Sequence, residues 1–254
     1  MFLIVIAAFI GALLSFFCGF GLGTILLPAF ASYYALPLAV SATSAVHLAN
    51  NGFKLFLVGR HAHWPTVWRF GWWSFVGAML GALLLVFISD GPSLCSYVFL
   101  GHSFQVSVIK FVMGAMMISF AIFEWMQSDQ AVIVPHGLLP YGGIISGFFG
   151  GLSGHQGALR SAFLMRSGLT KEQFLGTRVV VACLVDIPRL AIYGVAFMQS
   201  WNGVDKQWLL AAAGFAFLGA WLGNRWVRKM TFQHIQRIVG VALILFGAML
   251  IAGF

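Results

Sequence analysis

Residues 142–163 read GGIISGFFGGLSGHQGALRSAF, and residues 11–30 read GALLSFFCGFGLGTILLPAF. Each segment places a cluster of glycines inside a long apolar stretch. These two stretches, near 2–33 and 134–166, are too long for one straight membrane helix, which needs about 20 residues. The pattern predicts a helix that is broken at membrane depth or folds into a re-entrant hairpin. Backbone of this kind is tolerated only where protein buries it or where it lines a wet cavity.

The composition identifies the bilayer as the solvent of this chain. Of its 254 residues, 61% are hydrophobic and 8% are charged, whereas a soluble domain has about 25% charged residues. The first apolar stretch has no basic residue before it and no small-residue cleavage site, so we interpret it as a membrane helix and not a signal peptide. We therefore expect an all-α, polytopic membrane protein. The other apolar stretches fall near 38–59, 68–89, 104–126, 173–199, 206–226 and 235–254.

The two halves of the chain resemble each other. The segment SFFCG at 15–19 aligns with SGFFG at 146–150, and NGFK at 51–54 aligns with DIPR at 186–189. Further matches follow in the same order, so we predict an internal duplication within one membrane domain. Transporters built from such repeats bind substrate near the membrane midplane, where helices of the two repeats are interrupted. The predicted boundaries of the two transmembrane repeats are 1–130 and 131–254.

The glycines of the two clusters can contact a ligand or allow helices to pack closely. Interrupted helices expose backbone N–H groups, and a helix N-terminus carries about half a positive charge that favours an anion. A G-x-x-x-G spacing, present at Gly147 and Gly151, instead lets two helices approach closely. Both interpretations stay open. The glycines predicted to contact a ligand are Gly19, Gly21, Gly23, Gly150, Gly151 and Gly154.

Basic residues within the apolar stretches indicate an anion site. Arg160, Arg178, Arg189 and Lys54 lie in these stretches, and Asp186 is the one deep carboxylate among them. A charge at the centre of a span costs at least about 2.5–3.5 kcal/mol, so it needs a functional or structural reason. Lys54 and Arg189 occupy matching positions in the two halves. We predict that the four cations bind the substrate and that Asp186 orients Arg189 or accepts a coupling proton.

Each cation also has a structural interpretation. Asp186 and Arg189 are three residues apart on one predicted helix and can form a structural ion pair. Lys54 and Arg178 can extend to the headgroups from near the ends of their spans. Arg160 is the deepest and has no carboxylate nearby in the sequence, so we interpret it as functional.

Polar residues beside the second glycine cluster are candidates for further substrate contacts. They are Ser153, His155, Gln156 and Thr177. His155 can equally be a structural histidine, and His47 is interpreted as a packing residue. His61 and His63 lack cysteine or carboxylate support for a metal, so we expect no metal and no cofactor. The chain has no basic domain outside the membrane, which argues against a nucleic-acid partner.

These motifs resemble the TauE/SafE family of sulfite exporter-like anion permeases. The chain is similar to the family in CGFGLGTILLP at 18–28 and GFFGGLSGHQGAL at 147–159. It is also similar in the threonine-containing segments SATSAV at 41–46 and GTRVVV at 176–181, each of which follows a short linker. The resemblance spans essentially the whole chain. Family members often have more glycines in the second cluster, where this chain has Ser153, His155 and Gln156.

The resemblance implies secondary transport of a small sulfur-containing anion such as sulfite, thiosulfate or sulfoacetate, in the bacterial cytoplasmic membrane. Protons are a possible coupling ion, and the protein is not expected to be an enzyme. Three alternatives stay open at this point. They are an anion channel built on the same cavity, a non-transporting assembly partner in the membrane, and an enzyme that pairs Cys18 or Cys183 with His47 or His155.

Overall fold

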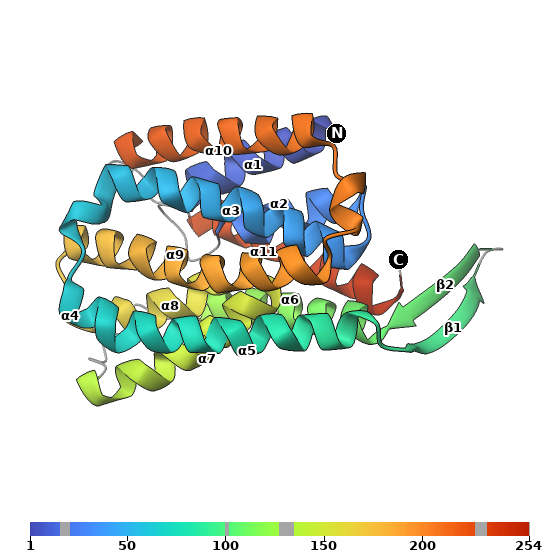
Figure 1. The fold of residues 1–254 in the computed structure, drawn as a ribbon, viewed down its shortest axis with the longest axis horizontal. Coiled ribbons are helices and arrows are strands. Elements are labelled where there is room, and N and C mark those ends of the chain that lie inside the picture. The colour runs from blue at the N-terminus through green and yellow to red at the C-terminus, as the bar shows by residue number, and fades with distance from the viewer. Residues whose placement is uncertain (16–20, 100–101, 127–134, 227–232, 254) are drawn as a thin grey trace.

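The computed structural model describes residues 1–15, 21–99, 102–126, 135–226 and 233–253. Within them the fold is a bundle of helices that run along its long axis, with one hairpin at the end (Figure 1). The first half contains α1 (Phe2–Leu14), α2 (Leu22–Ala31), α3 (Leu36–Val58), α4 (Trp64–Thr66), α5 (Trp72–Ser89) and α6 (Val108–Met126). The second half contains α7 (Leu139–Ser153), α8 (Gly157–Leu164), α9 (Lys171–Ala196), α10 (Lys206–Trp226) and α11 (Gln233–Ile251). Short helical turns at Gly59–His61, Val67–Gly71, His136–Leu138 and Ser200–Gly203 connect these elements.

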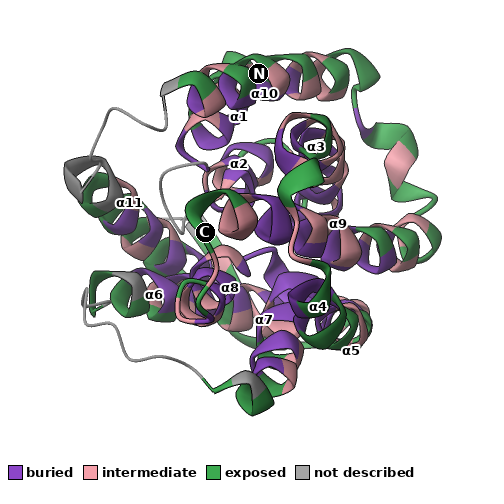
Figure 2. Cartoon of the chain, turned by 90° about the vertical axis from the view of Figure 1, so that its left-hand side faces the viewer, coloured by how far each residue is buried: buried purple, intermediate pink, exposed green. Residues whose placement is uncertain are grey.

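Helices from the two halves pack against each other in pairs. Helix α1 packs on α10, and α5 packs on α7. Helices α3 and α9 contact each other between these two pairs, and α6 packs on α11 (Figure 1). Buried residues line the inner faces of the helices, whereas exposed residues cover the outside (Figure 2). The centre of the molecule therefore lies where the two halves meet.

Glycines bring α5 and α7 into close contact. A Cβ atom built on Gly147 would overlap the backbone of Ser74, and one built on Gly151 would overlap the backbone of Ala78. On the facing helix, a Cβ built on Gly81 would overlap the Phe148 carbonyl in the same way. For Gly147 and Gly151, the packing interpretation of the G-x-x-x-G spacing is thus the one the structure supports.

The described structure is largely helical, as expected of an all-α fold, and a short β-hairpin accompanies the helices. Strand β1 (Ser93–Phe99) pairs antiparallel with β2 (His102–Ser107), and the hairpin projects beyond the helices (Figure 1). The predicted apolar stretch from 104 therefore begins as a strand, and its helix starts at Val108. In β2 the apolar residues Phe104 and Val106 alternate with polar ones, a pattern that suits a strand better than a helix. Tyr97 donates to the carbonyl of Ala252, so the C-terminal residues anchor the hairpin.

The helix lengths agree in part with the expected membrane spans. Among the described residues, Trp64–Ser89 and Lys171–Ala196 are long and apolar enough to cross a bilayer. Four shorter apolar helices accompany them, at Phe2–Leu14, Leu22–Ala31, Val108–Phe123 and Arg237–Ile251. Two of these, α1 and α2, divide the first long stretch, whereas α7 and α8 divide the fifth.

Candidate anion site

The second glycine cluster breaks a helix, as predicted. Helix α7 ends at Ser153, and Gly154 has a left-handed backbone with φ of 83°. Glycine adopts this conformation without the steric penalty that a Cβ atom causes. Helix α8 then begins at Gly157. The chain thus stops one helix and starts another inside the bundle.

The first glycine cluster meets this break. Helix α1 ends at Leu14, and α2 begins at Leu22 with Gly21 as its N-cap. A Cβ atom built on Gly23 would lie 3.4 Å from the Gly154 carbonyl oxygen. The two clusters are therefore neighbours in space, although about 130 residues separate them in the sequence. Gly19 lies outside the described residues.

A polar cavity lies where the two breaks meet. The volume open to the centres of water-sized molecules is about 30 Å³, room for roughly two to three waters. The start of α2, at Gly21, and the start of α8, at Gly157, both face it. Its lining residues are Ser15, Gly21, His47, Asn51, Lys54, Gly154, Gln156, Gly157, Arg160, Leu175, Arg178, Val179 and Ala182. These include three cations and, among the described residues, no carboxylate.

Lys54 and Arg178 are held at the cavity by the end of α1. The Nζ of Lys54 donates to Ser15 Oγ, and Nη2 of Arg178 donates to the Ser15 carbonyl oxygen. Arg178 also lies over the ring of Phe174, with 5.9 Å between the guanidinium carbon and the ring centroid. Both cations are buried, at 5% and 8% exposure, so they do not extend to the headgroups. Ser15 thus holds both cations at the cavity through its neutral oxygen atoms.

Arg160 lines the cavity and has unfilled hydrogen-bonding capacity. It lies in the first turn of α8, where its backbone N–H donates to the Gln156 carbonyl at 2.9 Å. Its side chain is 5% exposed, and within the described part of the chain its Nε and Nη1 atoms have no hydrogen-bond partner. Both side-chain amide atoms of Gln156 are equally without a partner. Since buried polar groups in proteins are nearly always partnered, these donors mark a place for a ligand.

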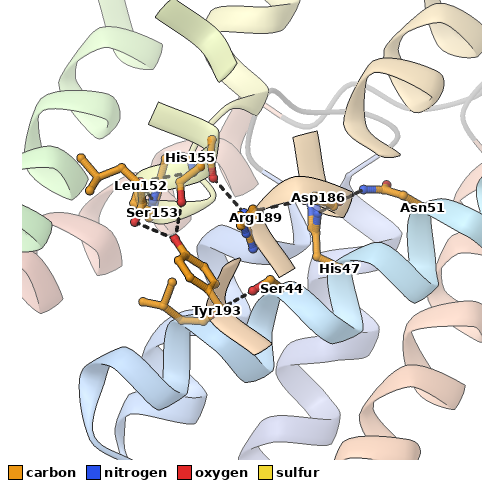
Figure 3. Close-up of polar contacts among 12 residues, drawn as sticks. Ser44, His47, Asn51, Leu152, Ser153, His155, Asp186, Arg189 and Tyr193 are labelled. Carbon is orange, nitrogen blue, oxygen red and sulfur yellow. Dashed lines mark hydrogen bonds and ion pairs between the residues drawn. The ribbon is translucent and has the colours of Figure 1, made fainter. Parts of the chain in front are cut away.

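Arg189 lies behind the cavity wall and does not line it. Its Nη1 donates to the Gly150 carbonyl at 2.9 Å and lies 3.7 Å from Asp186 Oδ1 (Figure 3). The contact with Asp186 is the ion pair that the spacing of three residues allowed. Arg189 therefore holds the end of α7 in place and does not reach the cavity, where we predict the substrate contacts.

The remaining predicted contacts also lie outside the cavity lining. Ser153 Oγ donates to the Phe149 carbonyl, one turn earlier on α7, at 3.1 Å, and it lies 3.0 Å from His155 Nδ1. The ring of His155 stacks on Phe120. Thr177 accepts from the backbone N–H of His63, which fixes a loop.

His47 and Asn51 belong to the site, although the sequence interpretation assigned His47 to packing. His47 Nδ1 lies 2.6 Å from Asp186 Oδ2, and Asn51 Nδ2 donates to the same oxygen at 2.7 Å (Figure 3). Both residues line the cavity together with Lys54. A signal for them exists in the sequence, because positions 47, 51 and 54 follow the i, i+4, i+7 spacing of one helix face.

The fold and site together define a helical membrane protein with a buried cationic cavity between its halves. The family model of the sulfite exporter TauE/SafE matches residues 3–250. The chain therefore belongs to this family of integral membrane transporters, which are not enzymes and carry anions such as sulfite. Searches of curated proteins and of solved structures found no match.

Proposed function

We propose that the protein is a secondary transporter of a small inorganic oxyanion of the sulfite type. The observation that carries this proposal is the cavity lined by Lys54, Arg160 and Arg178, with no carboxylate among its described lining residues. Three buried cations in one place repel each other, and an anion bound between them would relieve that repulsion. The helix starts at Gly21 and Gly157, which both line the cavity, add positive dipole ends.

The size of the cavity favours the smaller members of the substrate class. Space for roughly two to three water molecules accommodates a compact ion such as sulfite or thiosulfate. The carbon chain of an organosulfonate such as sulfoacetate would need additional room. Apolar contacts for such a chain are few, since Leu175, Val179 and Ala182 lie on one helix of the lining.

Alternating access around this cavity is supported by the way the helices pair. Helix α1 of the first half packs on α10 of the second, and α7 of the second half packs on α5 of the first. In both cases the first helix of one half packs on a later helix of the other half, and two equivalent halves would produce this reciprocal pairing. It favours the division into repeats at 1–130 and 131–254, which can rock against each other around the central cavity.

Flux in proteoliposomes tests the proposal. The purified protein is reconstituted, and uptake of radiolabelled sulfite or thiosulfate is compared for the wild type, Arg160→Ala and Arg225→Ala. Arg225 is the matched control, because it is exposed, lies over the ring of Trp221 and is not among the cavity-lining residues. We expect Arg160→Ala to lose at least about tenfold in flux, equivalent to about 1.4 kcal/mol, while Arg225→Ala keeps it.

Three results would contradict the proposal. Unchanged flux in Arg160→Ala would remove the cavity from the transport pathway. Ohmic currents without saturable counterflow would identify an anion channel, since a carrier exchanges labelled and unlabelled anion across the membrane. Absence of flux for every sulfur oxyanion in the wild type would favour an assembly partner.

A further inference from the structure

The histidine that lines the cavity is bound on its other side to an aspartate. His47 Nδ1 and Asn51 Nδ2 both lie within 2.7 Å of Asp186 Oδ2, at 2.6 and 2.7 Å. Asp186 is fully buried, and His47 is 7% exposed. Two acceptor atoms only 2.6 Å apart would repel each other, so the His47–Asp186 contact requires one proton between these two side chains. Asn51 Nδ2, which also lies 3.0 Å from His47 Nδ1, can only donate. The pair therefore already holds one proton when the imidazole is neutral.

The other edge of the imidazole ring faces the cavity. A Cβ atom built on Gly21 would lie 3.8 Å from His47 Nε2, and Gly21 itself lines the cavity. Within the described residues, His47 Nε2 has no hydrogen-bond partner. A neutral imidazole whose Nδ1 donates has its lone pair on Nε2. That lone pair can take a second proton only from the side of the cavity.

The charges around His47 come from three helices. Lys54 lies on α3, the same helix; Arg160 lies on α8; and Arg178 and Arg189 lie on α9 with Asp186. Helix α2, which brings Gly21 and Gly23 against the ring, adds no charged side chain among its described residues. The surrounding cations oppose a proton on Nε2 while the cavity is empty. An anion in the cavity reverses this balance, since it attracts the proton as well as the cations.

We propose that His47 takes up a proton from the cavity when the anion binds, with Asp186 as its counter-ion, so that anion and proton move together. The proton adds to the Nε2 lone pair, the imidazolium donates to the anion, and both leave on the opposite side of the membrane. The inference rests on the proposed function, because it uses the same cavity. Binding of the two ions is then reciprocal, so each strengthens the binding of the other.

Calorimetry of thiosulfate binding tests this coupling in the purified, full-length protein. Thiosulfate is the probe because it remains a dianion near neutral pH and adds no proton of its own. Titrations in two buffers with different ionisation enthalpies give the number of protons taken up per anion. At a pH where His47 is neutral before the anion binds, we expect the wild type to take up nearly one proton per thiosulfate. We expect uptake near zero in His47→Gln.

Matched variants and a folding check accompany the measurement. His63→Gln is the control, because His63 contacts Thr66 and lies outside the cavity lining. It should keep the wild-type proton count. Asp186→Asn removes the counter-ion but keeps a hydrogen-bonding side chain, and its proton count should fall as in His47→Gln. Size-exclusion profiles and melting temperatures establish that each variant is folded.

The outcomes separate this inference from the proposed function. If neither thiosulfate nor sulfite binds the wild type, the proposed function is overturned, and this inference with it. Anion binding without proton uptake in the wild type would overturn this inference alone, as would an unchanged proton count in His47→Gln. Should both variants fail to fold, transport by the wild type in proteoliposomes under a proton gradient tests the coupling instead. Uptake must then accelerate with an inward proton gradient, and uptake that ignores the gradient contradicts the coupling.

Discussion

The guanidinium of Arg189 lies against Gly154, at the point where α7 stops. A Cβ atom on Gly154 would come within 2.8 Å of Arg189 Nη1, and the backbone there has a positive φ. The break in the helix and the position of Arg189 are thus one structural unit. Although Arg189 does not line the cavity, it supports the turn that does.

Gly154→Ala should therefore impair both folding and transport. A side chain in the left-handed conformation costs about 1–2 kcal/mol, and its Cβ atom also displaces Arg189. Gly168→Ala is the matched control, since Gly168 has φ of 75° and nothing within 4 Å of its added Cβ. We expect both variants to melt at lower temperature and only Gly154→Ala to lose transport. Equal transport in the two would show that the Arg189 contact has no functional role.

Lys54→Met should weaken anion binding while the fold persists. Methionine keeps much of the length of the buried side chain and removes the charge that faces the cavity. We expect at least a tenfold higher Kd for thiosulfate, equivalent to about 1.4 kcal/mol. Lys206→Met, at an exposed position that begins α10, is the control and should leave the Kd unchanged. A wild-type Kd in Lys54→Met would place the anion away from this cation.

Asp186→Ala should be strongly destabilising. Removal of one partner from a buried ion pair costs about 3–5 kcal/mol, because the other charge stays buried without compensation. Here the change also deprives His47 and Asn51 of their shared acceptor. Thermal unfolding in detergent measures the effect, and Asp90→Ala, at an exposed position after α5, should melt close to the wild type. A melting temperature equal to that of Asp90→Ala would contradict the buried network.

Gly147→Ala should separate α5 from α7. The added Cβ would overlap the backbone of Ser74, and overpacking of this kind costs about 1–3 kcal/mol. Gly194→Ala is the control on α9, because nothing lies within 4 Å of its added Cβ. Alanine is the better helix former, so this control should be neutral or slightly stabilising. A Gly147→Ala variant as stable as Gly194→Ala would show that the helices adapt without cost.

Much of the helical fold follows from local sequence. The apolar run at 206–226 coincides with α10, and the glycines of the second cluster mark the end of α7, since both signals depend on residues close in the chain. The hairpin at 93–107 was missed because its apolar residues continue directly into α6. Alternation over so short a segment is a weak signal beside a long helix.

The sequence indicates which kinds of residue form the candidate site, but not which of them line the cavity and which lie behind it. The cavity is lined by four residues expected at the site: Lys54, Gln156, Arg160 and Arg178. Charged residues inside a membrane protein need a polar surrounding, which is why their burial points to such a cavity. Sequence alone does not tell which face of α9 points toward the cavity, so Arg189 and Arg178 could not be distinguished. Both lie on the same helix, eleven residues apart, yet only Arg178 reaches the lining.

The reciprocal pairing of helices between the halves has a consequence for biosynthesis. Helix α1 is synthesised before α10, on which it packs, and α5 is synthesised before its partner α7. Domains that fold during synthesis usually complete their N-terminal parts first. Here the first half cannot bury its glycine-lined and alanine-lined faces until the second half has been inserted. These faces of α1 and α5 must therefore be shielded by lipid or by the insertion machinery until their partners from the second half have entered the membrane.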